Sequence, residues 1–374
     1  MEKLNRRNFL KKASGITATG GTALLLGCGS PQNDNASAPA VNTGKKFRWK
    51  MVTTWPPKFP VVGEGAEMFA KLVDEMSSGR LKIRVYGGGE LVPALETFDA
   101  VSQGVAEMGH GASYYWRGKA AATPFFCSIP FGMNAQQMNA WILSGGGLAL
   151  WDELYAPFNL RPFPAGNTGV QMGGWFNRKI NSIADIKGLK MRIPGLGGEV
   201  ITRAGGSAVL SPGGEIFTNL ERGVIDATEW IGPYHDYLMG FHKVAKYYYY
   251  PGWHEPGSVL ELIINKSSYD ELPKDLQTII QVAAQWANVW MLSEFEAKNS
   301  IYLQKIIDEQ RTQILPFPDD VLSAFRKIAD ETIEEIISED PMSKKVYESF
   351  RKFQKETESW ADITEKAYYL NLSL

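Results

Sequence analysis

Hydrophobic and polar residues alternate along several short runs of the chain, and segments with helical spacing lie between these runs. The runs FRWKMVT and RLKIRVY alternate at almost every position, which is typical of strands with one buried face. The first half of the chain combines expected strands over 47–53, 80–86 and 106–112 with expected helices over 63–77 and 95–103. A strand–helix–strand–helix–strand order predicts a small parallel sheet.

The same order recurs between Gly188 and Trp230. This segment combines expected strands over 189–193, 207–210 and 224–227 with expected helices over 200–204 and 215–222. Ligands of parallel α/β sheets gather at the carboxyl ends of the strands. Arg192 and Glu229 lie at two such ends, which makes them the first candidates for a binding site.

Further elements connect and extend the two units. Strands are expected over 160–167, 170–177 and 258–264, a helix broken by glycines over 134–156, a late strand over 314–317, and C-terminal helices over 319–338 and 343–360. Helical spacing also persists from about Pro273 to Asp308. At 1.5 Å per residue, such a helix is about 50 Å long, which is more than the width of either unit.

The N-terminus carries export signals. Arg6-Arg7, followed by Phe9-Leu10, is a twin-arginine pattern, and the apolar run over 13–27 is too short to span a bilayer. Leu25-Leu26-Gly27-Cys28 resembles a lipobox with Cys28 as the acylated residue, and cleavage without lipidation is the alternative. Residues 1–28 are therefore expected to be a signal and the polar residues 29–45 a flexible tether, in a periplasmic protein.

Composition narrows the class of protein. The chain carries a net charge of −2, and because residues 1–27 carry +4, the remainder is close to −6. An acidic protein without basic runs is not expected to bind nucleic acid. Cys127 is flanked by apolar residues and has no partner if Cys28 is lipidated, so a buried structural thiol is expected. The four histidines lack zinc spacing, and no nucleophile, phosphate-loop or dinucleotide motif is present, so the sequence predicts no enzyme.

A family resemblance rests on residues 185–230. The pattern consists of DIKGLKMR ending at Arg192, a Gly-Gly pair, and EIFTNLERGVIDATEW ending at Trp230. The chain resembles the solute-binding subunits of tripartite ATP-independent periplasmic (TRAP) transporters, the DctP family, over about residues 46–350. It is most similar to the branch that binds 2-oxo acids and related monocarboxylates together with a metal ion.

The resemblance implies an α/β fold with two lobes, of the type II-like periplasmic binding protein class, with hinge strands and one long helix that spans both lobes. The implied boundaries are 46–166 with 253–270 for the first lobe, 167–252 with 309–340 for the second, 271–308 for the long helix and 341–374 for C-terminal helices. In this branch a C-terminal helix can be exchanged between protomers, so a homodimer is expected.

The resemblance also implies a binding site. Arg192 is expected to clamp the carboxylate of the substrate, since a guanidinium matches a carboxylate with two hydrogen bonds. Gln171, Glu229 and the carbonyl oxygen of Trp230 are expected to hold a cation, with Glu255 as a further ligand at the pocket. A set of oxygen ligands favours a hard ion such as Na⁺ or Ca²⁺. Candidates for the pocket wall from the opposite lobe are Tyr114, Tyr115, Trp116 and Trp55, although aromatic residues also fill lobe interfaces without binding ligand.

The sequence therefore predicts a periplasmic protein that binds a small 2-oxo or 2-hydroxy monocarboxylate with a cation and delivers it to a TRAP permease. No organic cofactor is expected. Two alternatives remain open at this point: a periplasmic enzyme that is exported with its cofactor, and a ligand sensor with the same fold.

Overall fold

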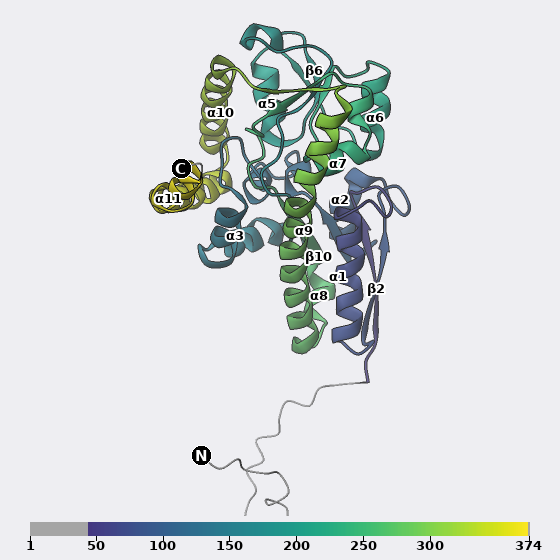
Figure 1. Ribbon diagram of the computed structural model, residues 1–374. Coiled ribbons are helices and arrows are strands. Elements are labelled where there is room, and N and C mark those ends of the chain that lie inside the picture. The colour runs from purple at the N-terminus through teal and green to yellow at the C-terminus, as the bar shows by residue number, and fades with distance from the viewer. Residues whose placement is uncertain (1–43, 373–374) are drawn as a thin grey trace, which may run out of the picture. The chain divides into compact units, whose positions relative to one another are not determined.

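The computed structural model describes residues 44–372 (Figure 1). The twin-arginine pattern, Cys28 and nearly all of the expected tether lie outside the described residues. Among residues 44–372, no helix combines the length and the apolar character needed to cross a bilayer.

The first sheet has five strands in the order β2-β1-β3-β10-β4. Its strands are β1 (Phe47–Thr53), β2 (Leu81–Tyr86), β3 (Met108–Gly111), β4 (Leu160–Asn167) and β10 (Val259–Asn265). The strands β1, β2 and β3 are parallel, as the alternating runs predict, and β10 pairs antiparallel with both β3 and β4.

The second sheet has six strands in the order β11-β9-β5-β8-β6-β7. Its strands are β5 (Gly174–Phe176), β6 (Lys190–Arg192), β7 (Ser207–Val209), β8 (Ala227–Thr228), β9 (Tyr247–Tyr250) and β11 (Gln313–Pro316). Strand β6 lies between β8 and the edge strand β7 and is parallel to both, which confirms the parallel unit predicted around Arg192.

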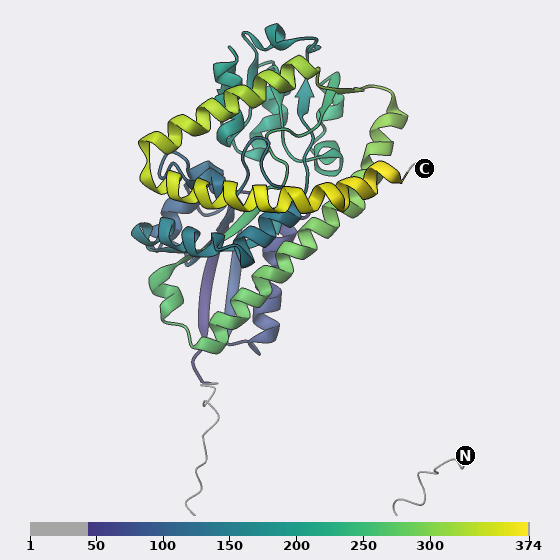
Figure 2. The same cartoon turned by 90° about the vertical axis from the view of Figure 1, so that its left-hand side faces the viewer.

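Helices cover both sheets and link them. They are α1 (Val62–Met76), α2 (Thr97–Ser102), α3 (Ala135–Ser144), α4 (Gly147–Tyr155), α5 (Gly195–Arg203), α6 (Gly213–Glu221), α7 (Pro233–Leu238), α8 (Lys266–Asp270), α9 (Lys274–Glu309), α10 (Asp319–Glu339), α11 (Pro341–Ile363) and α12 (Glu365–Asn371). The long helix α9 contacts α1 and β4 beside the first sheet and α7 beside the second, so it spans both parts of the fold as predicted (Figure 1). Figure 2 shows α10 and α11 as consecutive helices that fold back on each other.

Two segments cross between the sheets, and they lie side by side. Residues 168–173 lead from β4 to β5, and residues 251–258 lead from β9 back to β10. They are joined by backbone hydrogen bonds from Gln171 to Glu255 at 3.2 Å and from Thr168 to Ser258 at 3.0 Å. A Cβ atom at Gly252 would lie 2.2 Å from the carbonyl oxygen of Gln171, so only glycine permits this close approach.

Two strand predictions are wrong in extent. The strand expected over 170–177 exists only as β5, because the backbone N–H of Gln171 bonds the other crossing segment and Gly174 has a positive φ of 115°. The strand expected over 224–227 is reduced to β8, since Val224 is 57% exposed and lies outside the ladder. The proposed lobe boundaries stay predictions.

An acidic residue is buried in the first sheet, and no basic side chain among the described residues pairs with it. The side chain of Glu261 on β10 is fully buried and accepts hydrogen bonds from the Trp116 indole and from the Tyr155 hydroxyl, the latter at 2.8 Å. Burial raises the pKa of Glu261 from 4.5 to about 7, against the lowering effect of these two donors. The folded protein therefore keeps a proton between about pH 4.5 and 7 that the unfolded chain loses.

We expect this carboxyl group to make the protein less stable as pH rises from about 4.5 to 7, by at most about 3 kcal/mol since one pKa unit is about 1.36 kcal/mol. Glu261→Gln removes the titration, so its melting temperature relative to the parent should be higher at pH 8 than at pH 4.5. Glu67→Gln, at an exposed position of α1, is the matched control. If the difference in melting temperature between Glu261→Gln and the parent were the same at both pH values, the raised pKa of Glu261 would be contradicted.

Candidate ligand and cation site

Polar side chains converge between the two sheets, where the crossing segments meet the ends of β6 and β8. Arg192 ends β6 and pairs in register with Thr228 of β8, so Glu229 follows directly beside it. Gln171 and Glu255 come from the two crossing segments. The four side chains belong to residues that are at most 4% exposed. The structure thus brings together the predicted clamp and the predicted cation ligands.

Arg192 and Glu229 form a buried ion pair. The guanidinium Nη1 donates to the Glu229 carboxylate and to its carbonyl oxygen, the latter at 3.4 Å, and Nε donates to the carbonyl oxygen of Ser211 at 3.2 Å. Nη2 is buried and has no partner among the described residues. Burial by itself lowers the pKa of Arg192, but the Glu229 carboxylate raises it above its usual value, so the guanidinium stays charged.

Gln171 and Glu255 form a second polar group. The amide of Gln171 donates to Glu255 Oε2 at 2.8 Å, and the Ser258 hydroxyl donates to the same oxygen at 2.5 Å. The carbonyl oxygen Oε1 of Gln171 is buried and finds no donor among residues 44–372. An unpaired buried amide oxygen is costly, which indicates a ligand at this position.

His254, which the sequence analysis did not select, lies beside these residues. Its Nε2 is 3.5 Å from Glu229 Oε2, and neither that oxygen nor either ring nitrogen has a hydrogen-bond partner within the described chain. Burial lowers the pKa of His254 to about 4, so the ring is neutral at pH 7. In the sequence, the signal that could have pointed to His254 as a site residue is its position directly before Glu255, in the crossing segment.

Burial also raises the pKa values of the two carboxyl groups in the site. It raises the pKa of Glu229 to about 7, with Arg192 acting in the opposite direction. The pKa of Glu255 is also raised to about 7, by burial first and then by the neighbouring Glu229 carboxylate. Two adjacent buried carboxyl groups with one guanidinium leave an excess of negative charge when both are ionised, and a cation would offset it.

Asp236 holds the segment that carries Glu229 and Trp230. Its buried carboxylate accepts from the backbone N–H of Ile231 at 3.1 Å, from the Tyr248 hydroxyl at 2.7 Å and from the Trp175 indole at 2.9 Å. The backbone next to Trp230 is therefore fixed from within the second sheet. Hydrogen bonds of this kind fix the orientation of metal ligands, so they would hold the Trp230 carbonyl oxygen in position to bind the predicted cation.

Aromatic residues from the first sheet close the site. Tyr114 and Tyr115 lie on a short turn after β3, with ring centroids 4.8 Å apart. Tyr114 packs on Gly195 at the start of α5, and the Arg192 guanidinium lowers the pKa of Tyr115 against a larger effect of burial, which raises it to about 12. Trp230 lies 5.4 Å from the Arg192 guanidinium. Of the predicted wall residues, Tyr115 thus lies next to Arg192 and Tyr114 next to α5, whereas the Trp116 indole donates to Glu261 within the first sheet.

Trp55 reaches the same place from the loop between β1 and α1. Its ring centroid is 6.5 Å from that of Trp230, and its indole donates to His110 at 2.7 Å. Phe59 of the same loop contacts Trp230 at 6.2 Å, between ring centroids. The loop therefore joins the first sheet to the segment that carries Glu229.

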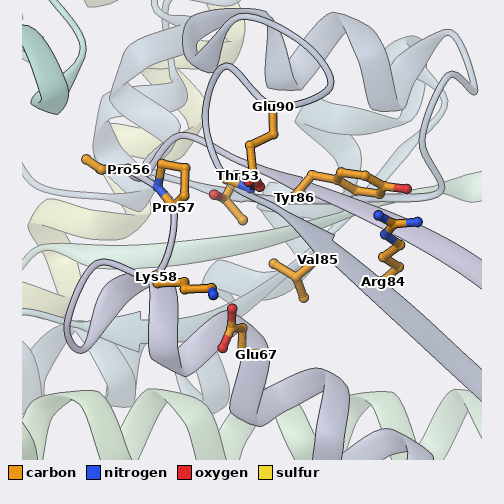
Figure 3. Close-up of a pocket in the computed structure, with 11 residues that line it drawn as sticks. Thr53, Pro56, Pro57, Lys58, Glu67, Arg84, Val85, Tyr86 and Glu90 are labelled. Atoms are coloured by element: carbon orange, nitrogen blue, oxygen red, sulfur yellow. Dashed lines mark hydrogen bonds between the residues drawn. The ribbon is translucent and has the colours of Figure 1, made fainter.

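A separate cavity of about 450 Å³ is lined in part by this loop (Figure 3). Its lining includes Pro57 and Lys58 of the loop, Glu67 of α1, Arg84 of β2 and Glu90. None of the residues that line it is a predicted site residue. Its charged side chains are exposed and of both signs, so the buried group around Arg192 remains the candidate site.

The buried group has the chemistry of a site for a carboxylate and a cation. A guanidinium with a free N–H suits a carboxylate, and the unpaired oxygens of Gln171 and Glu229 suit a metal ion. The unpaired atoms are observations of this chain, so the residues fit the cation that the family resemblance implies.

The model of the bacterial extracellular solute-binding protein family 7, DctP, matches residues 51–340. The chain belongs to the DctP family. A monocarboxylate 2-oxoacid-binding periplasmic protein of a Nostoc strain is 44% identical over 98% of each chain. A TRAP periplasmic solute-binding protein of Pseudoalteromonas atlantica, solved with sodium and pyruvate, is 44% identical with a TM-score of 0.85. One of Colwellia psychrerythraea, solved with calcium and pyruvate, is 44% identical with a TM-score of 0.86. Both structures cover 88% of this chain and are themselves covered completely.

The matches confirm the family and the two-sheet TRAP-binding-protein fold with its long helix. As a DctP protein, the chain is a periplasmic solute-binding protein of the transport class and not an enzyme, which removes the enzyme alternative. The solved relatives contain Na⁺ in one case and Ca²⁺ in the other.

Proposed function

We propose that this DctP protein binds a small 2-oxo monocarboxylate such as pyruvate, together with a cation, and delivers it to the membrane subunits of a TRAP transporter. The observation that carries the proposal is the set of buried atoms without partners among the described residues: Arg192 Nη2, Gln171 Oε1 and Glu229 Oε2. One donor and two acceptors thus lack partners within one buried group of side chains, which matches an anion next to a cation. The relatives that contain pyruvate with Na⁺ or Ca²⁺ support this choice.

Each residue has a distinct role in the proposal. Arg192 binds the carboxylate of the acid through its free N–H, while Gln171, Glu229 and the Trp230 carbonyl bind the cation. The adjacent carboxylate and 2-oxo oxygens of the acid complete the shell of the cation. Glu255 orients Gln171 through the 2.8 Å hydrogen bond and contributes negative charge near the ion. Tyr114 and Tyr115 limit the space available for the acid.

Binding requires that the site opens. Arg192 and Glu229 are each at most 1% exposed, so neither ion nor acid reaches them from solvent in this arrangement. The ligands come from the second sheet and the crossing segments, while the tyrosines come from the first sheet. We infer that the crossing segments act as a hinge and that ligand contacts made only in the closed form drive the closure.

Thermal unfolding tests the function directly. The protein without residues 1–43 is heated with pyruvate, 2-oxobutyrate, lactate, succinate or sialic acid, each with Na⁺, with Ca²⁺ and with a chelator. A ligand at 100 times its dissociation constant stabilises the folded state by about 2.7 kcal/mol, so pyruvate or 2-oxobutyrate should raise the melting temperature only when a cation is present. No increase with any monocarboxylate would overturn the proposal.

The C-terminal helices support the proposed homodimer. Helices α11 and α12 and the residue that follows α12 expose large apolar side chains, and six of them are more than half exposed: Trp360, Ile363, Tyr368, Tyr369, Leu370 and Leu372. A second copy of the chain would cover this face. We expect a dimer by light scattering, and a monomer when the chain ends before Trp360. A monomeric full-length protein would contradict the pairing.

Export and anchoring rest on residues outside the described part of the chain. We propose that the twin-arginine pattern directs export and that Cys28 carries the lipid that holds the protein at the membrane. Labelling with a fatty-acid analogue should mark the parent and not Cys28→Ala. Equal labelling of the parent and of Cys28→Ala would show that Cys28 is not the residue that carries the lipid.

A further inference from the structure

We propose that His235 of α7 is a positioning residue for the cation site, and that it acts by holding the Trp230 indole against the loop between β1 and α1. The inference deepens the proposed function and rests on it for the role of the Trp230 carbonyl oxygen as a cation ligand. His235 binds neither the ion nor the acid in this proposal, so its effect passes through Trp230.

The first observation is the hydrogen bond between the two side chains. The Trp230 indole donates to His235 Nδ1 at 3.3 Å, and both residues are buried, with exposed fractions of 5% and 0%. Burial lowers the pKa of His235 to about 3, so the ring is neutral at pH 7. Since an indole N–H can only donate, Nδ1 carries the lone pair and Nε2 carries the proton. The contact with Trp230 therefore fixes the tautomer of His235.

The second observation is that the His235 ring lies between the two parts of the fold. Phe59, in the loop between β1 and α1, meets this ring edge to face with centroids 4.8 Å apart, and Phe295 of α9 lies 4.7 Å from it. The Pro60 carbonyl of the same loop raises the pKa of His235 against the larger effect of burial, so an acceptor of the loop lies near the ring. His235 thus joins the segment that carries Trp230 to a loop of the first sheet.

The loop is held in a conformation that presents Phe59 to this ring. Lys58 and Val61 have positive φ angles of 56° and 59°, which are unusual outside glycine and costly for a β-branched side chain. Hydrogen bonds maintain this backbone: the N–H of Phe59 donates to the Pro56 carbonyl at 3.1 Å, and that of Val61 donates to the Glu64 carboxylate at 3.1 Å. Strained backbone persists at ligand clamps where its surroundings hold it. The loop therefore keeps Phe59 in place for contact with His235.

The contact between the loop and His235 depends on closure of the site. Phe59 follows β1 of the first sheet, whereas Trp230 and His235 follow β8 of the second. Opening of the site, which the proposed function requires, separates Phe59 from the other two rings. In the closed form, Phe59 packs on the imidazole that holds Trp230, so the Trp230 carbonyl oxygen is fixed for the cation. A contact that exists only in the closed form slows dissociation of the ligand more than it changes association.

The variants separate the hydrogen bond from simple filling of the space between the sheets. His235→Phe keeps a ring beside Phe59 but offers the indole no acceptor, and Trp230→Phe keeps a ring but removes the N–H. Both changes remove the same hydrogen bond, so their effects should not add in the double variant. His242→Phe is the matched control, because it makes the same replacement at a buried histidine that stacks on Tyr237.

Stopped-flow fluorescence and calorimetry measure the rates and the affinity for pyruvate with saturating Ca²⁺ in the whole exported protein. We expect His235→Phe to raise the dissociation rate constant at least about tenfold and to change the association rate constant less than about threefold. The double variant should bind no more than about twofold more weakly than the weaker single variant. His242→Phe should match the parent.

Phe59→Ala tests the loop and keeps the proposal testable if a change at His235 prevents folding. We expect it to raise the dissociation rate constant at least about fivefold. An unchanged dissociation rate in His235→Phe or in Phe59→Ala, or losses that multiply in the double variant, would overturn the proposal. Binding of pyruvate with Ca²⁺ to the parent is measured in the same series, and that result decides the proposed function separately.

Discussion

Arg192→Ala should reduce the affinity for pyruvate by at least about 30-fold. Truncating one partner of a buried, hydrogen-bonded charge pair costs about 2–5 kcal/mol, and 1.4 kcal/mol corresponds to a factor of ten. Arg192 is the proposed carboxylate clamp, and its Nη2 is a buried donor that finds no partner among residues 44–372. Calorimetry with pyruvate at saturating cation measures the loss. The variant should also unfold more easily, because Glu229 stays buried without its counter-charge.

Arg192→Lys separates charge from geometry. Lysine keeps the positive charge but lacks the planar fork that gives two parallel hydrogen bonds to a carboxylate. We expect an affinity between those of the parent and of Arg192→Ala. Arg203→Ala removes an arginine that pairs with Glu335 on the surface and serves as the control. Unchanged affinity in Arg192→Ala would exclude Arg192 as the clamp.

Much of the fold was predictable, because its periodic elements bury one face. The alternation over 47–53 corresponds to β1, which has the same bounds in the structure. Helical spacing from about Pro273 to Asp308 corresponds to α9 within one or two residues. The pairing of Arg192 with Glu229 was less accessible, since it depends on β6 and β8 being adjacent and on a register that places Arg192 opposite Thr228.

The crossing segments were the weakest part of the prediction. Their residues lack periodicity, because the backbone hydrogen bonds run between two loops and not within a sheet. Gln171 was selected through the family pattern, although it lies in a loop where a strand was expected. His254 was missed, because histidines were judged by their spacing to each other, whereas its neighbours in space are carboxylates.

The ion pair between Arg192 and Glu229 couples the two ligands. Glu229 occupies one N–H of the guanidinium and is also a proposed cation ligand. A cation bound by the Glu229 carboxylate weakens the hydrogen bond that this carboxylate accepts from Arg192. The guanidinium then becomes available to the acid. Cation and acid should therefore each raise the affinity for the other by the same factor, since coupling between two binding equilibria is reciprocal.

Glu229→Gln should remove most of this coupling. In the parent, saturating cation is expected to raise the affinity for pyruvate by at least tenfold, within the usual coupling range of about 1–3 kcal/mol. In the variant, the neutral amide neither binds the ion strongly nor competes for Arg192, so we expect a change of less than threefold.

The measurement is a pair of pyruvate titrations, with cation and with chelator, in each protein. Glu199→Gln changes a partly exposed carboxylate that pairs with Arg117 and is the matched control. A cation effect of the same size in Glu229→Gln and in the parent would show that the ion acts elsewhere. A lost effect, together with an acid affinity in chelator that is raised towards that of the parent with saturating cation, would place the coupling in the contact between Arg192 and Glu229.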